Sequence, residues 1–157
     1  MNNHPIWQQE SVILNNQLMI RSFEYWTGKQ LINTQGTPEQ ISKALFELPF
    51  PVLCHDTQPD PIFNYGNQKA MELWEVTWEE LTQMPSRYSA EAIVREDRLK
   101  LLKTVAENGY IENGTGVRIS KTGRRFAISN LTVWNVLDNH NNYCGQAATY
   151  KTWQYLD

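Results

Sequence analysis

Apolar residues recur at helical spacing from Gln8 to Trp26, a stretch that contains no Pro or Gly. This pattern predicts one long amphipathic helix. One of its sides carries Val12, Met19, Phe23 and Trp26. A second apolar group, on the opposite side or just before the helix, comprises Trp7, Leu14, Leu18 and Tyr25. Each apolar stripe of a helix has to be buried against another surface. We therefore expect the second stripe to pack either against another helix of the chain or against a second copy in a homodimer.

The next segment begins with a helix and continues into two short strands. Thr37–Gln40 has the form of a capping box with Pro at the first helical position, and it predicts a helix that ends at Leu48, before Pro49. The run Val52–His55 is typical of a buried strand. Ile62–Tyr65 is expected to be the strand that returns after a Pro-rich turn.

Three helices are expected between this strand pair and the last third of the chain. The first covers Asn67–Trp74. A second capping box, at Thr77–Glu80, begins a short helix that Pro85 closes. The third and longest covers Glu96–Asn108, and Gly109 provides its C-terminal stop.

The remainder of the chain has the pattern of β-structure. Strands are expected at Gly116–Ser120 and Arg125–Leu137, on either side of a tight turn. After a polar loop at 138–142, a last strand runs from Tyr143 to about Trp153. This order of elements predicts an α+β fold, with a five-stranded antiparallel sheet, short helices on one face and two helices in front.

Size, composition and charge narrow the class of protein. A chain of 157 residues with 20% charged side chains suffices for a single core. Its formal net charge of −3 provides no field that would attract a nucleic-acid backbone or an anionic membrane, so neither partner is expected. The first basic side chain is Arg21, and no apolar stretch approaches the ~20 residues of a membrane span. We therefore expect a cytoplasmic protein.

The two cysteines, Cys54 and Cys144, lie far apart in sequence and belong to no C-x-x-C pair. This spacing disfavours a zinc site and a disulfide framework, and no metal is expected. If the first and last strands are neighbours, the geometry allows a redox pair. Two free cysteines that act as small buried hydrophobes are the more ordinary explanation.

The local motifs resemble those of PAS domains. In the first half, Leu53–Asp56 and Ile62–Ala70 are similar to the PAS opening of an apolar strand, an acidic turn, a strand and an Asn-led helix. In the second half, the PAS helix, hairpin and closing strand are matched by Glu96–Arg98, Gly109–Tyr110, Gly116–Phe126, Val136–Asp138 and Cys144–Gly145. The resemblance implies a PAS-like domain at 49–157 behind an N-terminal helical extension at 1–48.

More closely, the whole chain resembles MEKHLA-domain proteins, whose PAS-like domain also stands at the carboxyl end of plant class III homeodomain leucine-zipper regulators. This resemblance implies a sensory or protein-interaction module without catalytic activity. Its output would pass to a homodimer partner or another signalling protein, with the N-terminal helix as the expected surface of transfer. Trp7, Leu14, Leu18 and Tyr25 are the candidate dimer contacts.

The residues that PAS sensors use for cofactors are not in their usual places. A flavin-adduct photosensor of this fold carries a Cys on the short helices, and the stretch Asn67–Asn108 contains none. The common haem sensors carry a His there, whereas the three histidines of this chain are His4, His55 and His140. The sequence therefore identifies no cofactor, and His55 is interpreted as a structural strand histidine.

A ligand site is predicted from polar residues interleaved with apolar ones on the last two strands. If strict alternation holds, one face carries Phe126, Ile128, Asn130, Thr132 and Trp134, and the facing strand carries Cys144, Gln146, Ala148 and Tyr150. Asn130, Thr132 and Gln146 would then hydrogen-bond a small ligand between the aromatic walls of Phe126, Trp134 and Tyr150. The alternative is that these side chains satisfy an ordinary core.

Three further interpretations stay open. The basic cluster Arg118, Lys121, Arg124 and Arg125 surrounds a hairpin turn, where it either keeps an edge soluble or binds an anion. A small α+β cone-fold enzyme of the ketosteroid-isomerase type would need a buried base, for which only His55 and Asp56 are suitably placed. A ligand-free interaction module, with aromatic side chains filling the core, is the third.

Overall fold

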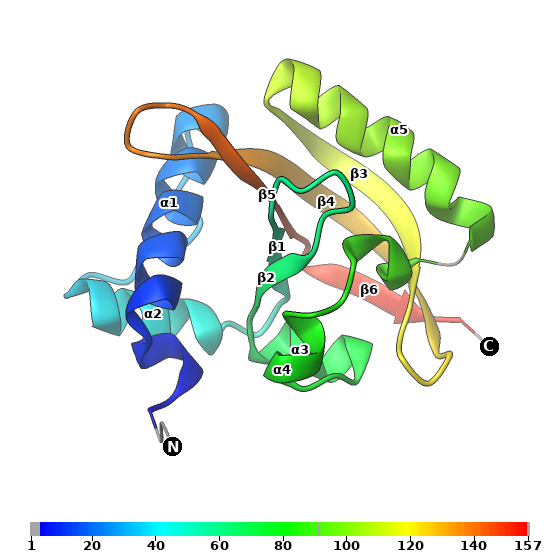
Figure 1. Cartoon of the computed structure of the whole chain (residues 1–157), viewed down its shortest axis with the longest axis horizontal. Helices are drawn as coiled ribbons and strands as arrows, with labels where there is room; N and C mark the ends of the chain where they lie inside the picture. The colour runs from blue at the N-terminus through cyan, green and yellow to red at the C-terminus, as the bar shows by residue number, and fades with distance from the viewer. Residues whose placement is uncertain (1–3, 91, 157) are drawn as a thin grey trace.

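The computed structural model describes residues 4–90 and 92–156. Along the chain (Figure 1), the elements are η1 (Ile6–Gln8), α1 (Glu10–Thr27), α2 (Pro38–Phe46), β1 (Val52–His55), β2 (Phe63–Gly66), α3 (Gln68–Trp74), α4 (Trp78–Leu81), η2 (Ser86–Ser89), α5 (Ala92–Asn108), β3 (Tyr110–Ile119), β4 (Arg125–Leu137), β5 (Tyr143–Thr149) and β6 (Thr152–Tyr155). The predicted α+β class is confirmed, and the predicted order of the main elements holds as far as β5.

The strands form one antiparallel sheet in the order β2-β1-β5-β4-β3, and β6 pairs with β4 as a sixth strand. The prediction of a single last strand to Trp153 was wrong, because the ladder breaks at Tyr150. Up to Thr149 the chain pairs with the second half of β4, and from Thr152 it pairs with the first half. The buried Tyr150 lies between these two segments.

Strand β4 changes its facing direction at Asn130, which has a positive φ of 56°. Before it, Phe126 and Ile128 contribute to the core under the short helices, whereas after it Leu131 and Val133 do so. Trp134 belongs to the core on the opposite face. The strict alternation that we expected for this strand is therefore wrong, because one left-handed residue shifts the two-residue period by one.

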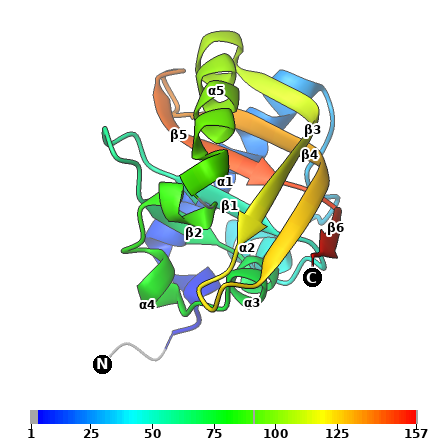
Figure 2. The same cartoon turned by 90° about the vertical axis from the view of Figure 1, so that its right-hand side faces the viewer.

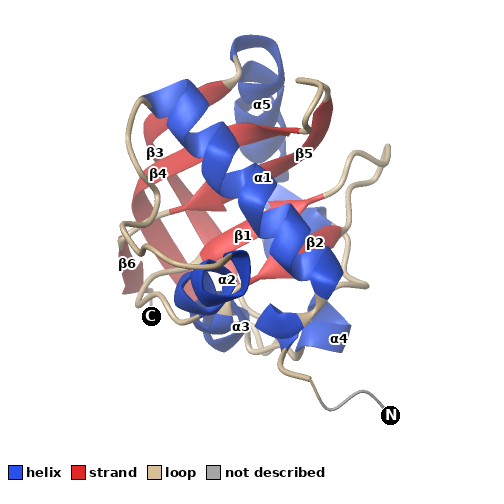
Figure 3. Cartoon of the chain, turned by 90° about the vertical axis from the view of Figure 1, so that its left-hand side faces the viewer, coloured by secondary structure: helices blue, strands red, loops and turns tan. Residues whose placement is uncertain are grey.

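Two groups of helices cover the two faces of the sheet. Helices α1 and α2 lie across one face, as the view in Figure 3 shows, and their core includes Met19, Phe23, Leu45 and Trp134. The other face is covered by α3, α4 and α5, with α5 along β3 and β4 (Figure 2). The prediction of helices on one face thus holds for the three later helices, while α1 and α2 occupy the second face.

Helix α1 buries the predicted stripe. Val12, Met19 and Phe23 are buried against the sheet, while Trp26 is half-buried and its indole N–H donates to the carbonyl oxygen of Asn135 at 2.9 Å. Among the described helices, none has both the length and the apolar composition needed to cross a bilayer.

Local sequence signals explain most of the helix starts. Both predicted capping boxes are present, at Thr37 and Thr77. Helix α5 begins at Ala92, four residues earlier than expected, because no Pro or Gly lies between Pro85 and Gly109 to stop it. Strand β3 likewise begins at Tyr110, because the pairing accommodates the segment around Gly114 as bulges.

Candidate ligand-binding site

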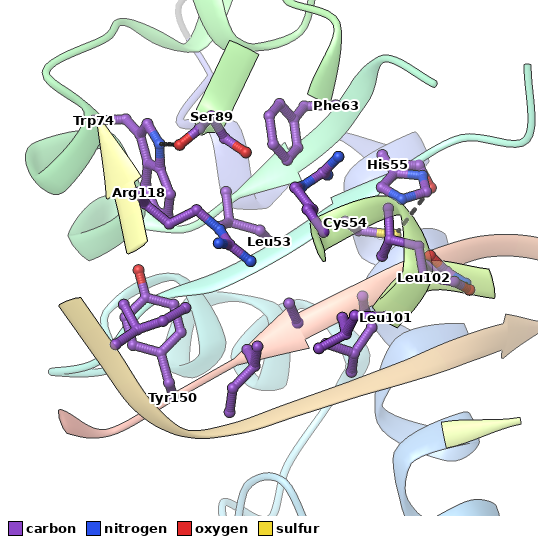
Figure 4. A pocket seen from close by; sticks show the side chains of 17 residues that line it. Leu53, Cys54, His55, Phe63, Trp74, Ser89, Leu101, Leu102, Arg118 and Tyr150 are labelled. Carbon is purple, nitrogen blue, oxygen red and sulfur yellow. Dashed lines mark hydrogen bonds between the residues drawn. The ribbon is translucent and has the colours of Figure 1, made fainter. Parts of the chain in front are cut away.

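A cavity of about 50 Å³ lies between the sheet and the later helices. Its walls come from β1, β2, β3, β4, β5, η2, α3 and α5, so residues from both halves of the chain meet there (Figure 4). Most of the wall is apolar. The polar side chains of the lining are His55, Ser89, Arg98, Arg118, Gln146 and Tyr150.

His55 is positioned by β1, where it follows Leu53 and Cys54 at the end of a fully buried strand. Its Nδ1 lies 2.8 Å from the carbonyl oxygen of Asp56, which can only accept, so Nδ1 carries a proton. The Nε2 atom is buried and has no hydrogen-bond partner. Burial lowers the pKa of His55, and Arg98 acts in the same direction. The ring is thus neutral near pH 7, with Nε2 as an available acceptor.

Arg118 extends from β3 and folds back over its own strand. Its Nη1 donates to the carbonyl oxygen of Val117 at 2.9 Å. A Cβ atom on Gly116 would lie only 2.6 Å from that Nη1, so this glycine gives the guanidinium its position. The cavity lining contains no Asp or Glu. Burial lowers the pKa of Arg118, which nevertheless remains a cation.

Tyr150 follows β5 and is 2% exposed. Its hydroxyl oxygen is buried without a hydrogen-bond partner. Burial raises the pKa of the phenol, and the charge of Arg118 opposes this effect. The hydroxyl therefore keeps its proton at neutral pH and can donate it to an acceptor in the cavity.

Gln146 connects the cavity wall to the rest of the molecule. Its Nε2 donates to the carbonyl oxygen of Leu102 on α5 and to Oδ1 of Asn135 on β4, each at 3.2 Å. Asn135 in turn donates to the carbonyl oxygen of Val105 at 3.1 Å, and its own carbonyl oxygen accepts from Trp26. One polar chain thus extends from the cavity to α5 and to α1.

A family model for the MEKHLA domain matches residues 14–155, nearly the whole chain. The chain belongs to the MEKHLA-domain family. Similar curated proteins include the homeobox-leucine zipper proteins HOX10 of Oryza sativa subsp. indica and ATHB-9 of Arabidopsis thaliana, which are 22% and 25% identical. Each match covers 87% of this chain but only 16% and 17%, respectively, of the relative.

The MEKHLA domain is also similar to solved PAS and Light-Oxygen-Voltage structures. A PAS domain from Colwellia psychrerythraea superposes with a TM-score of 0.63 and 17% identity, covering 72% of this chain and 93% of that one. A structure titled for a flavin analogue in a Light-Oxygen-Voltage domain gives 0.56 and 18%, covering 75% and 85%. The fold is therefore the PAS fold, and the alternative cone fold was wrong.

The six ligand residues expected from sequence do not gather at one place in the MEKHLA domain. Gln146 and Tyr150 line the cavity. Phe126 packs edge-on against Trp74 beside it. Asn130 and Thr132 line a separate surface groove, and Trp134 lies on the α1 face, because Asn130 shifts the strand period.

The charged part of this site is not evident from the sequence pattern. That pattern groups Arg118 with three basic residues around a turn and favours a structural role for His55. Both line the cavity. One feature of the sequence distinguishes Arg118 from the other three basic residues. It directly follows Gly116 and Val117 and so lies within the predicted strand, not at the turn.

The remaining candidate residues contribute little chemistry. Cys54 and Cys144 are free thiols in or beside the core under α1; Cys54 also lines the cavity, and burial raises its pKa. The carboxylate of Asp56 accepts from the backbone N–H groups of Gln58 and Ile62 and so holds the β1–β2 loop. Within the described part of the chain, no cluster of three metal-ligating side chains is found.

The cavity of the MEKHLA domain does not fit a flavin. Its volume of about 50 Å³ is far below the roughly 300 Å³ at which cofactor pockets begin. The helices also lack the cysteine that flavin-adduct chemistry uses, as the sequence of Asn67–Asn108 establishes.

Proposed function

We propose that this MEKHLA domain is a non-catalytic sensory module that binds a small molecule in its cavity and passes the change to a protein partner. One observation carries this proposal: the hydroxyl of Tyr150 is buried in the wall of the cavity without a hydrogen-bond partner. An unsatisfied buried polar group costs about 1–3 kcal/mol. Such a group at an apolar cavity is the arrangement expected of a site that a ligand completes.

The hydrogen-bond chain through Gln146 and Asn135 supports the signalling part of the proposal. A ligand that bonds the amide of Gln146 competes with its bonds to Leu102 on α5 and to Asn135. Asn135 contacts α1 through Trp26. Occupancy of the cavity is therefore coupled to the positions of two helices that lie on opposite faces of the sheet.

The direct test is native mass spectrometry of the protein purified under non-denaturing conditions, compared with the same sample after denaturation. A bound mass that is released on denaturation supports the proposal. A matched pair of variants locates the site at which this mass is bound. Gln146→Leu changes the cavity wall, whereas Gln154→Leu changes an exposed position on β6. A mass retained equally by both variants, or a ligand-free protein that also fails to bind small molecules added to it, would contradict a ligand in this cavity.

A homodimer through α1 is the second candidate, and the exposure of this helix favours it. Leu14 and Tyr25 are 54% and 67% exposed, so both side chains are open to a partner. The other two predicted contacts are partly covered within the chain: Leu18 packs on the α1 core, and Lys43 lies over the ring of Trp7. The outer face of α1 is thus proposed to meet the same face of a second copy.

Light scattering of a Leu14→Glu/Tyr25→Glu double variant tests this candidate. We expect a dimer in the unchanged protein and a monomer in the variant, while Tyr88→Glu, at another exposed aromatic residue, leaves the mass unchanged. Removal of all residues through Trp26 would be a poorer test, because it also removes the buried Met19 and Phe23. A monomer in the unchanged protein would overturn the proposal.

A further inference from the structure

The charge balance of the cavity is uneven. Arg98, Arg118 and His55 line it, and no acidic side chain does. Arg118 is half-buried, and a guanidinium that is partly withdrawn from water without a counter-charge is costly, so structures pair such a group with a carboxylate or another anion. Arg98 has an interaction partner in the structure, and burial keeps His55 neutral near pH 7. Arg118 is thus the cation whose charge the cavity lining does not balance.

The hydrogen bonds of Arg118 lead to the same conclusion. A guanidinium has five N–H donors in a planar fork. Toward the described residues, Arg118 makes one hydrogen bond, to the carbonyl oxygen of Val117. Figure 4 shows its side chain reaching into the cavity beside Leu53, with the ring of Tyr150 near it. The remaining donors of Arg118 and the unpartnered hydroxyl of Tyr150 are available to one acceptor group.

The rest of the wall defines the other end of the ligand. It is built of aliphatic and aromatic side chains, among them Leu101, Leu102, Ile128, Leu131 and Val133. A second charge against these groups would be left without a partner. The volume of about 50 Å³ limits the ligand to a few heavy atoms.

Resting on the proposed function, we propose that the cavity takes a short-chain monocarboxylate, whose carboxylate is held by the guanidinium of Arg118 and the hydroxyl of Tyr150 and whose hydrocarbon end lies against the apolar wall. A carboxylate matches the guanidinium fork and accepts from a phenol, and such charge-assisted bonds are about twice as strong as neutral ones. Gly116 belongs to this site, because it leaves the space that Arg118 occupies.

Isothermal titration with three probes tests the charge of the ligand. Butyrate is the expected binder, butyramide is its neutral counterpart of the same shape, and succinate carries a second carboxylate. We expect butyrate to bind at least about 10-fold more tightly than the other two. Equal binding of butyramide would overturn the carboxylate and leave the ligand-binding function standing. If succinate bound more tightly than butyrate, the proposal that the ligand carries a single carboxylate would be overturned.

Variants test which residues hold the carboxylate of the ligand. Arg118→Gln is expected to weaken butyrate binding about 10-fold or more, and Tyr150→Phe, which keeps the ring, to weaken it several-fold. Arg124→Gln is the control, because Arg124 belongs to the same β3–β4 hairpin as Arg118 but lies over the exposed Tyr155 of β6. Unchanged binding by a folded Arg118→Gln variant would overturn the assignment. If none of the three probes binds and native mass spectrometry also finds no ligand, the proposed function itself fails.

Discussion

The indole N–H of Trp134 donates to the main-chain carbonyl oxygen of Met19 at 3.1 Å, and both side chains are fully buried. This bond joins the last third of β4 to the middle of α1. The ring of Trp134 also packs edge-on against Phe23, with 5.0 Å between ring centroids. Attachment of α1 to the sheet thus depends on a specific polar contact within an apolar core.

Trp134→Phe should therefore destabilise the protein, because it removes the indole donor and leaves part of the ring volume empty. We expect the free energy of unfolding to fall by about 1–3 kcal/mol in urea denaturation. Trp153→Phe, at a half-buried position near the edge of the sheet, is the matched control and should cost less. If both variants lost the same free energy of unfolding, the contact between Trp134 and α1 would contribute no more to stability than the contacts of Trp153.

His55 should make stability depend on pH. Burial lowers its pKa in the folded protein below the ordinary 6.5, so the unfolded chain takes up a proton at a higher pH than the folded one. The contribution of His55 to stability is complete above 6.5 and is lost as the pH falls from there through the folded pKa. We expect His55→Gln to flatten the fall in unfolding free energy between about pH 7 and 5, measured by denaturation at each pH. His140→Gln, in an exposed loop, should retain the slope of the unchanged protein.

Asn67 should be among the most sensitive polar positions. Its Oδ1 accepts from the N–H groups of Val52 and Ala70, and its Nδ2 donates to the carbonyl oxygens of Leu45 and Phe50, all within 3.2 Å. Asn67→Ala leaves these buried groups without partners, and we expect it to cost about 3 kcal/mol or more in thermal or chemical unfolding.

Thr37→Ala provides the comparison for Asn67. Thr37 also caps a helix, but at an exposed position where water replaces the lost bond, so a cost of about 1 kcal/mol is expected. If the two variants lost the same stability, Asn67 would be acting only as the N-cap of α3.

Gly116→Ala should act on Arg118 rather than on the backbone. The new methyl group would meet Nη1 at 2.6 Å, and the flexible guanidinium can move away at little cost. We expect the melting temperature to change little and butyrate binding to weaken toward that of Arg118→Gln. Thr115→Ala, at the exposed neighbouring position, should leave both quantities unchanged. Full binding by Gly116→Ala would mean that the observed position of Arg118 is not required.

The features that the sequence predicted correctly depend on short-range chemistry. The capping boxes at Thr37 and Thr77 act within one helical turn, and the apolar stripe of α1 follows the helical period, so both could be found without tertiary information. The Asn-led helix after Gly66 was found for the same reason.

The features that could not be predicted from the sequence depend on one backbone angle and on where residues distant in the sequence come together in the fold. The positive φ of Asn130 reverses the facing of β4, and an Asn in a strand gives no certain sign of that conformation. The basic cluster separates for a similar reason: Lys121 pairs with Glu80 and Arg124 lies over Tyr155, whereas Arg118 enters the cavity. These three cations look equivalent in the sequence but have different surroundings once the chain folds.

The small strand β6 also has a protective consequence. It pairs with β4 from Phe126 to Ser129, beyond the end of β5, so the open edge there belongs to a strand of four residues and not to the 13-residue β4. Long open edges recruit strands from other molecules and seed aggregation, and a very short edge strand limits this. Mutations that loosen Thr152–Tyr155 should therefore reduce the solubility of the folded protein more than its stability. The four residues of β6 thus limit self-association of the sheet.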